Sequence, residues 1–200
     1  DADSPLLSEQ DRKKFHGTVA RLLYLAKRVR PECLMAVAFL TTRVTKATRE
    51  DEAKLDRIIN YLRDNNDRGI TLTPGNRRIV ALGYFDAAYG IHEDGKSHTG
   101  ACLTVGDRGP VSVESTKQSI VTKSSTEAEL VATSDSTNML LHLRNFLTAQ
   151  GYAQGPSTMY QDNMSCMSLI EKGRSTKREW IRMRSSWYNE PPRSWGRHAR

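Results

Sequence analysis

The sequence predicts an α/β fold in which a mixed sheet follows a small helical segment. Residues 1–70 carry apolar side chains at helical spacing, whereas later residues alternate short apolar runs with turn-forming stretches. Three of these runs suit an antiparallel meander, and a helix, a strand and a second helix follow them. That order is typical of an α/β sheet with strands in both directions. We therefore expect a helical segment over 1–70, a sheet domain over 77–177 and a divergent basic tail over 178–200.

Three helices are expected before residue 70. The first covers DRKKFHGTVARLLYLAKRV and places five apolar residues on one face: Phe15, Val19, Leu22, Leu23 and Ala26. Pro31 interrupts this pattern and suits the first turn of a second helix, ECLMAVAFLTTRV. The third helix, REDEAKLDRIINYLRDNND, has apolar residues at i, i+3, i+4 and i+7: Leu55, Ile58, Ile59 and Leu62. The stretch NNDRG ends it.

The strands begin after residue 70. ITL and IVALGYFDAAYG are expected strands on either side of a turn at PGNRR. The second is almost continuously apolar, which predicts a central place in its sheet. TGACLTVG and VSVESTKQSIV complete the meander, with turns at GIHEDGKSH and DRGP. A helix over 126–150, the strand TMYQ ending at Asp162, and the helix NMSCMSLIEKG follow.

Composition indicates a globular protein without a membrane span. The chain has 200 residues, 38% hydrophobic and 26% charged, which suits one domain or one domain plus a small helical piece. No apolar run approaches the ~20 residues that a span needs, and the N-terminal stretch lacks a secretory apolar region, so we expect an intracellular protein. Cys33, Cys102 and Cys166 match no metal spacing and are expected to be reduced, packed thiols.

The net charge of +7 comes from the end of the chain. Residues 172–200 hold nine Lys and Arg and two acids, which leaves 21 basic and 21 acidic residues in 1–171. All three tryptophans also lie in this end: Trp180, Trp187 and Trp195. The charge by itself is therefore weak evidence for binding to nucleic acid.

Two glutamates stand at the front of the long helix expected over 126–150. Glu127 and Glu129 are about 200° apart around a helix and cannot face the same way. Ser124 with Glu127 and Thr126 with Glu129 both fit a capping box. Apolar residues directly after Glu129 favour its pointing toward the sheet, which leaves Glu127 as a cap or a solvent carboxylate.

Two aspartates follow expected strands. Asp86 comes after IVALGYF, where an unpaired buried carboxylate would be costly, although a turn aspartate is the simpler interpretation. Asp162 stands between a strand and a helix, where an N-cap is equally suitable. If the fold brings Asp86, Glu129 and Asp162 together, they repel one another unless they hold cations. Such oxygen ligands suit Mg²⁺, and two such ions promote phosphodiester cleavage.

Three motifs resemble the polyproteins of copia-type long-terminal-repeat retrotransposons. They are YFDAAYG, SVESTKQSIVTKSSTEAELVA and YQDNMSCMSL, which are similar to the family's Y-x-D-A-D, S-S-T-E-A-E-Y-x-A with its upstream K-Q, and Y-x-D-N-x-S-A. Upstream, FHGTVARLLYLAKRVRPECLMAVAFLTTRV and LDRIINYLRDNNDRGITL resemble the end of the family's reverse transcriptase. The resemblance covers residues 12–177 and implies a ribonuclease-H-like fold preceded by the connection-like end of reverse transcriptase.

The resemblance also implies an activity. Asp86 matches the family's first catalytic aspartate, Glu129 the glutamate of the first long helix, and Asp162 the third acid; all three would be catalytic and metal ligands. The implied reaction is cleavage of the RNA strand of an RNA–DNA hybrid by two-metal hydrolysis with Mg²⁺, Mn²⁺ being an alternative. The implied partners are the hybrid and the polymerase region of the parent polyprotein, without a membrane. The expected location is cytoplasmic, with a virus-like particle or the nucleus as alternatives.

The sequence departs from the family's pattern in two places. Ala88 replaces the second acid of the family's D-A-D, and Trp180 stands where the fourth catalytic acid would be. Glu179 is adjacent, but a shift of one residue changes the direction of a side chain. We favour a degenerate tail over one that holds phosphates or a disordered basic end. Cleavage is therefore expected to be impaired, and the alternative function is a non-catalytic retroelement remnant or scaffold.

Overall fold

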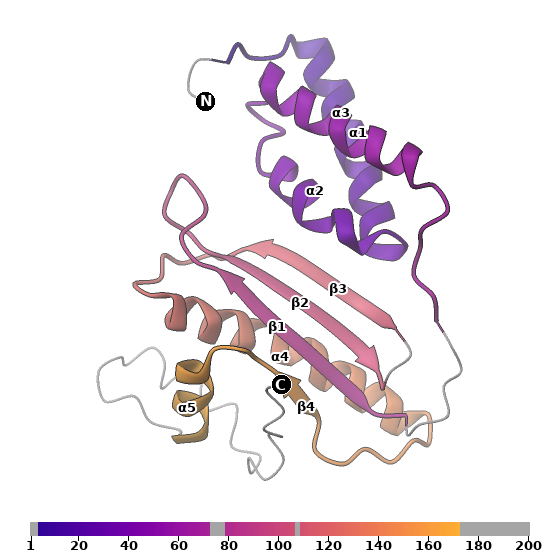
Figure 1. The fold of residues 1–200 in the computed structure, drawn as a ribbon, viewed down its shortest axis with the longest axis vertical. Coiled ribbons are helices and arrows are strands. Elements are labelled where there is room, and N and C mark those ends of the chain that lie inside the picture. The colour runs from indigo at the N-terminus through magenta and orange to yellow at the C-terminus, as the bar shows by residue number, and fades with distance from the viewer. Residues whose placement is uncertain (1–3, 73–78, 107–108, 173–200) are drawn as a thin grey trace. The chain divides into compact units, whose positions relative to one another are not determined.

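The computed structural model describes residues 4–72, 79–106 and 109–172 (Figure 1). The chain forms two compact units, Asp1–Thr71 and Leu72–Arg200. The divergent tail expected over 178–200, with Trp180 and Glu179, lies outside the described residues.

The first unit contains the three expected helices. They are α1 (Glu9–Arg28), α2 (Leu34–Thr41) and α3 (Arg49–Asp64), and a 3₁₀ turn, η1 (Pro31–Cys33), leads into α2. Ser8 begins α1 by accepting a hydrogen bond from the backbone N–H of Asp11. Thr48 and Asp51 form a capping box at the start of α3. Local capping therefore sets where α1 and α3 begin.

The buried stripe of these helices is narrower than the apolar pattern predicts. On α1, Phe15 and Val19 are buried, but Leu22 and Leu23 are only partly buried. On α3, the side chain of Ile59 is 38% exposed. Three helices cover only the central stripe of each other's surface, so apolar residues at the margin of a stripe stay in contact with solvent.

The second unit contains a four-stranded mixed sheet. Its elements are β1 (Ala81–Ala88), β2 (His98–Val105), β3 (Pro110–Lys117), α4 (Ser125–Ala149), β4 (Thr158–Tyr160) and α5 (Met164–Lys172). The strand order is β3-β2-β1-β4; β1, β2 and β3 form an antiparallel meander, and β4 is parallel to β1. The predicted mixed sheet, an antiparallel meander followed by a helix, a strand and a second helix, is confirmed. The strand predicted at ITL is wrong, because residues 70–72 pair with no neighbouring strand.

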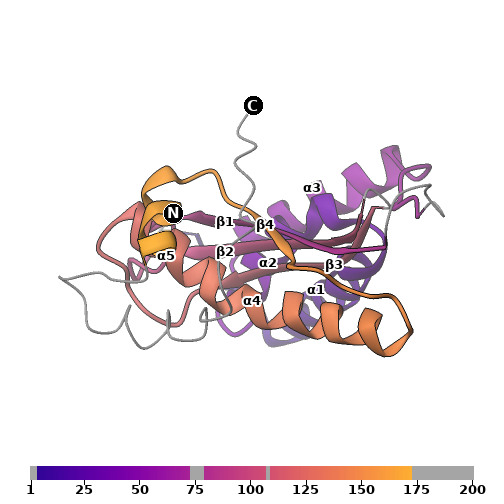
Figure 2. The same ribbon diagram turned by 90° about the horizontal axis from the view of Figure 1, so that it is seen from below.

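Helix α4 packs along one face of this sheet (Figure 2). The shared core consists of apolar residues from β1, β2 and α4: Ala81, Phe85, Ala101, Leu103, Leu140 and Leu147. Strand β1 is central, as predicted, yet its burial alternates, with Phe85 buried and Tyr84 and Asp86 exposed. Alternation follows because successive side chains of a strand point to opposite faces and α4 covers one of them.

The close approach of α4 to β1 depends on Gly83. A Cβ at this position would lie 2.6 Å from the ring Cζ of Phe85 and 3.3 Å from Cδ2 of Leu140. The absent side chain lets the helix pack directly on the strand that carries Asp86.

A chain of buried polar groups fastens the β1–β2 connection. The Nε2 atom of His92 lies 3.0 Å from Nδ1 of His98, and Nε2 of His98 lies 2.7 Å from the hydroxyl of Ser115 on β3. Burial lowers the pKa of both histidines; the charge of Lys117 lowers the His92 pKa further, and His92 does so for His98. Burial therefore favours the neutral form of both imidazoles, at the end of the sheet where β1 finishes.

The cysteines are free thiols, as predicted: Cys33 and Cys166 are buried and Cys102 is partly buried. Among the helices described, none combines the length and the apolar character that crossing a membrane requires.

Candidate functional site

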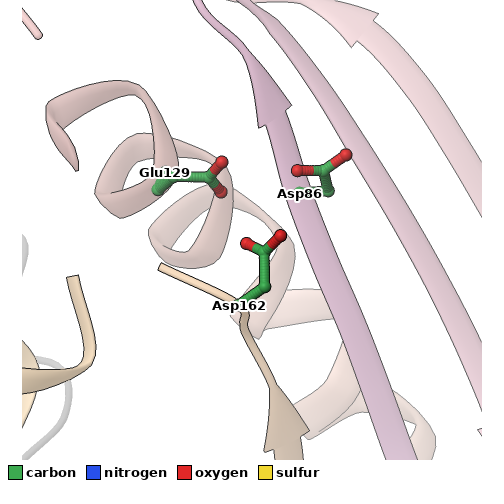
Figure 3. Close-up of side chains that lie close together, drawn as sticks. All are labelled: Asp86, Glu129 and Asp162. Atoms are coloured by element: carbon green, nitrogen blue, oxygen red, sulfur yellow. The ribbon is translucent and has the colours of Figure 1, made fainter. Parts of the chain in front are cut away.

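Three carboxylates from separate elements converge in the second unit (Figure 3). Asp86 lies on β1, Glu129 on α4 and Asp162 just after β4, and their ligand oxygens all lie within 4.8 Å of one another. Asp86 and Asp162 are exposed, whereas Glu129 is only 5% exposed. The structure thus brings together the three acids that the sequence singles out.

The two aspartates meet because β4 runs parallel to β1. The paired positions are Leu82 with Thr158, Gly83 with Met159 and Tyr84 with Tyr160. Continuing this register by two residues places Asp86 level with Asp162 and on the same face of the sheet. The rings of Tyr84 and Tyr160 stack with centroids 4.5 Å apart and planes 9° apart, which reinforces the register of a strand only three residues long.

The start of α4 decides which glutamate joins the cluster. Ser124 is the N-cap, and its hydroxyl accepts a hydrogen bond of 3.3 Å from the backbone N–H of Glu127. The carboxylate of Glu127 accepts one of 2.6 Å from the backbone N–H of Lys123. Glu127 is therefore a capping residue, one of its two expected roles, and it is buried rather than solvated. Glu129, two residues on, faces the strands.

Gln118 joins this helix start to the sheet. Its side-chain amide donates to the hydroxyl of Thr99 on β2 at 3.1 Å and to the backbone carbonyl of Ala128 at 3.0 Å. Ala128 directly precedes Glu129, so these bonds fix the position of the Glu129 backbone relative to β2.

The alternative role of Asp162 as a helix cap is not realised. The side-chain oxygen of Asn163 accepts a hydrogen bond of 2.9 Å from the backbone N–H of Cys166 and so caps α5. Asp162 is left to face Asp86. On the other side of Asp86, the residue paired with it on β2 is Gly100, which presents no side chain beside the cluster.

Burial makes Glu129 the unusual acid of the three. Burial raises the pKa of its carboxyl from 4.5 to about 7, because the ionised form loses water. Hydrogen bonds from Gln161 and from the backbone N–H of Ala87 oppose this increase, whereas the charges of Asp86 and Asp162 add to it. Ionised Glu129 is therefore held at a cost that a bound cation would remove.

The donor set suits a small divalent cation. Mg²⁺ takes six oxygen ligands at 2.0–2.1 Å, so oxygens on opposite sides of it are about 4.2 Å apart. Carboxylate oxygens already within 4.8 Å of one another reach such positions through small side-chain rotations. The residues present therefore fit a Mg²⁺ site that keeps open positions for water or a phosphate oxygen.

Sequence reasoning missed the groups that hold Glu129. Gln161 and Ala87 lie within the quoted motifs, but no local pattern indicates a contact with Glu129, which is 32 residues from Gln161 and about 40 from Ala87. Such contacts follow from the pairing of β4 with β1, which only the fold reveals.

No family model matches the chain. Two solved ribonuclease H1 structures are similar to part of it. The LC11 enzyme isolated from compost is 13% identical, with a TM-score of 0.43 over 55% of this chain and 73% of that one. The enzyme of Halobacterium salinarum is 18% identical, with a TM-score of 0.38 over 54% of this chain and 72% of that one.

Curated relatives give a clearer assignment. The retrovirus-related Pol polyproteins from the transposons RE1 and RE2 of Arabidopsis thaliana are each 31% identical over 160 residues, which is 80% of this chain. The polyprotein from transposon TNT 1-94 of Nicotiana tabacum is 28% identical over 178 residues, or 88%. The chain spans 11–13% of the length of these relatives. It is therefore homologous to part of the retrovirus-related Pol polyproteins of plant copia-type transposons.

Proposed function

We propose that the second unit is the ribonuclease H domain of a copia-type Pol polyprotein and that it hydrolyses the RNA strand of RNA–DNA hybrids. The observation that carries this proposal is the convergence of Asp86, Glu129 and Asp162 from three elements far apart in sequence. Exposed acids gather easily on a surface, but a buried glutamate beside two aspartates is costly without a cation. The homology to Pol polyproteins supports the same reaction.

The three acids are the residues that would hold Mg²⁺, or Mn²⁺ as an alternative. Such ions, when bound, supply an activated water and stabilise the leaving oxygen of a phosphodiester. The chain itself contributes placement. Hydrogen bonds from Gln161 and Ala87 hold the carboxylate of Glu129. Asp86 and Asp162 are exposed, so a phosphate of the substrate can approach from their side.

The first unit has a separate proposed origin. Its three helices would be the connection-like end of reverse transcriptase, and the proposed partners are the polymerase region of the polyprotein and the RNA–DNA hybrid. The basis is the resemblance of residues 12–70 to that part of the family, together with relatives that match 80–88% of the chain.

One observation favours a second candidate function, a non-catalytic remnant or scaffold. Trp180 occupies the position where the family has a fourth acid. Loss of one electrostatic contact to a developing charge commonly reduces a rate about a hundredfold to a thousandfold. We therefore expect weak or absent cleavage of hybrids by this chain, and only a modest gain from Trp180→Asp because the surrounding tail also differs from the family.

Cleavage of a labelled RNA–DNA hybrid with Mg²⁺ or Mn²⁺ tests the proposal, with duplex DNA as the substrate control. Any activity of the wild type should disappear in Asp86→Asn but persist in Glu127→Gln, which changes a capping carboxylate of the same helix. Robust cleavage that survives Asp86→Asn would place the chemistry elsewhere. Mg²⁺ binding that depends on Asp86, without cleavage, would favour the remnant.

A further inference from the structure

We propose that Gln161 is a positioning residue for the carboxylate cluster: its side-chain amide holds Glu129 in the orientation in which Glu129 can share a cation with Asp86 and Asp162. The inference rests on the proposed function, since it assigns how the cation site is kept assembled. It concerns a residue that lies between two motif positions and carries no charge.

The hydrogen bonds of Gln161 settle which way its amide points. Its Oε1 atom accepts a bond of 3.1 Å from the backbone N–H of Asn163. A backbone N–H can only donate, so the oxygen must be on that side and the nitrogen on the other. The Nε2 atom donates to Oε2 of Glu129 at 3.0 Å and to the hydroxyl of Thr133 at 3.2 Å. Both amide hydrogens are thus committed to α4.

Because it donates to both of these acceptors, the Gln161 amide is held in one orientation against α4. Glu129 and Thr133 are four residues apart and lie one above the other on the same side of α4. Thr133 is fully buried, so it anchors the amide to a part of the helix that does not move independently. The free end of Glu129 is otherwise repelled by Asp86 and Asp162, and Gln161 offers a donor that holds this carboxylate toward them.

Gln161 also links the positions of two of the three acids. It directly precedes Asp162, and both residues follow the end of β4 at Tyr160. The amide of Gln161 contacts α4, whereas the carboxylate of Asp162 lies beside that of Asp86, so the Gln161 side chain connects α4 to the end of β4. Asn163 then begins α5. Three consecutive residues thus have three roles: Gln161 contacts α4, Asp162 belongs to the carboxylate cluster, and Asn163 caps α5.

The test compares Gln161→Met with Gln154→Met. Gln154 makes the same number of hydrogen bonds at the other end of β4: it donates to the carbonyls of Ile79 and Tyr152 and accepts from the N–H of Ala81. None of these groups belongs to the carboxylate cluster. Titration calorimetry of the full chain with Mg²⁺ and with Mn²⁺ measures the affinity, and urea unfolding in EDTA measures the stability.

Removing a group that orients a metal ligand typically weakens metal binding about 10–100-fold. We expect that loss for Gln161→Met and unchanged affinity for Gln154→Met, although both variants lose stability in EDTA. Gln161→Asn, which keeps an amide but is one methylene too short to reach all three partners, should lose affinity as well. It serves in place of Gln161→Met if that variant fails to fold.

The two proposals fail in different ways. If the wild type binds Mg²⁺ through Asp86 and Gln161→Met binds it equally well, the role of Gln161 is refuted and the metal site stands. If the wild type binds neither ion, the proposed metal site is refuted and the role of Gln161 falls with it. Equal losses of affinity in the Gln161 and Gln154 variants would show a general effect of stability and would also refute the positioning role.

Discussion

Replacing Glu129 by glutamine should stabilise the metal-free protein at neutral pH while it removes cation binding. The substitution keeps the shape of the side chain and removes its charge. The substitution therefore separates the effect of the carboxylate charge on the stability of the fold from its effect on cation binding. A structural carboxylate would show the opposite behaviour, because its loss would destabilise the protein under every condition.

The magnitude follows from the pKa of Glu129. A rise from 4.5 to about 7 corresponds to about 3 kcal/mol, at 1.36 kcal/mol for each pKa unit. Asp86 and Asp162 are exposed, and solvent screens their share of the effect, so a value between about 1.5 and 3 kcal/mol is expected. Glutamine offers one acceptor oxygen instead of two and carries no charge, so its hydrogen bonding with Gln161 and Ala87 is weaker, which lowers the gain further.

The sign follows from proton linkage. Between pH 4.5 and about 7 the folded protein keeps the Glu129 proton, whereas the unfolded chain has lost it. This group therefore makes the wild type lose stability as pH rises through that window, and the loss is complete above about pH 7. The Gln variant lacks this dependence. The difference in free energy of unfolding, variant minus wild type, should grow from pH 4.5 to pH 8.

Urea unfolding followed by circular dichroism in EDTA measures this difference, in which contributions of other titrating groups cancel. With Mg²⁺ at 100 times its dissociation constant, the wild type should gain about 2.7 kcal/mol and Glu129→Gln almost none. Glu127→Gln is the matched control: it should lose stability at every pH, because its hydrogen bond to Lys123 weakens, and keep the response to Mg²⁺. A pH-independent difference for Glu129→Gln, or a wild type that gains no stability from Mg²⁺, would refute the assignment.

Three further predictions concern the framework around the site. Gly83→Ala should lower the free energy of unfolding by about 1–3 kcal/mol, measured in urea, because its Cβ would lie 2.6 Å from the ring of Phe85. Tyr160→Ala should cost about 1–2 kcal/mol and weaken Mg²⁺ binding by loosening Asp162, whereas Tyr160→Phe should leave both unchanged. Burial lowers the pKa of His98, so the unfolded chain takes up the His98 proton before the folded protein does as pH falls below about 6.5. The free energy of unfolding of the wild type therefore falls from pH 7 to pH 5. In His98→Gln it should fall less steeply over the same range, as measured in urea.

The helices and strands could be predicted from the sequence wherever a local signal sets them. Thr48 and Asp51 show how: they begin α3 through contacts three residues apart, which the sequence displays directly. The strand predicted at ITL failed for the opposite reason. A strand needs a partner, and no local pattern says whether one is available for residues 70–72.

In the site, too, local features could be predicted from the sequence and long-range contacts could not. Residue order and helical direction favoured Glu129 over Glu127 as the inward-facing acid, since direction is a local property. The sequence could not exclude Asp162 as a helix cap, because Asn163 offers the same chemistry one residue later. Gln161 could not be found at all, since its bond to Glu129 spans 32 positions and depends on β4 pairing with β1.

The burial of Glu129 also bears on the choice between an active domain and a scaffold. A scaffold needs the sheet and α4, and for both of these a neutral side chain at position 129 would serve better than a carboxylate with a raised pKa. Instead two hydrogen bonds, from Gln161 and from Ala87, hold that carboxylate beside two others. An arrangement that costs stability and gathers hard oxygen ligands favours a cation-binding site. On the proposal that Trp180 replaces the family's fourth acid, loss of activity in this chain would come from outside the cluster, and the cluster itself would still bind Mg²⁺.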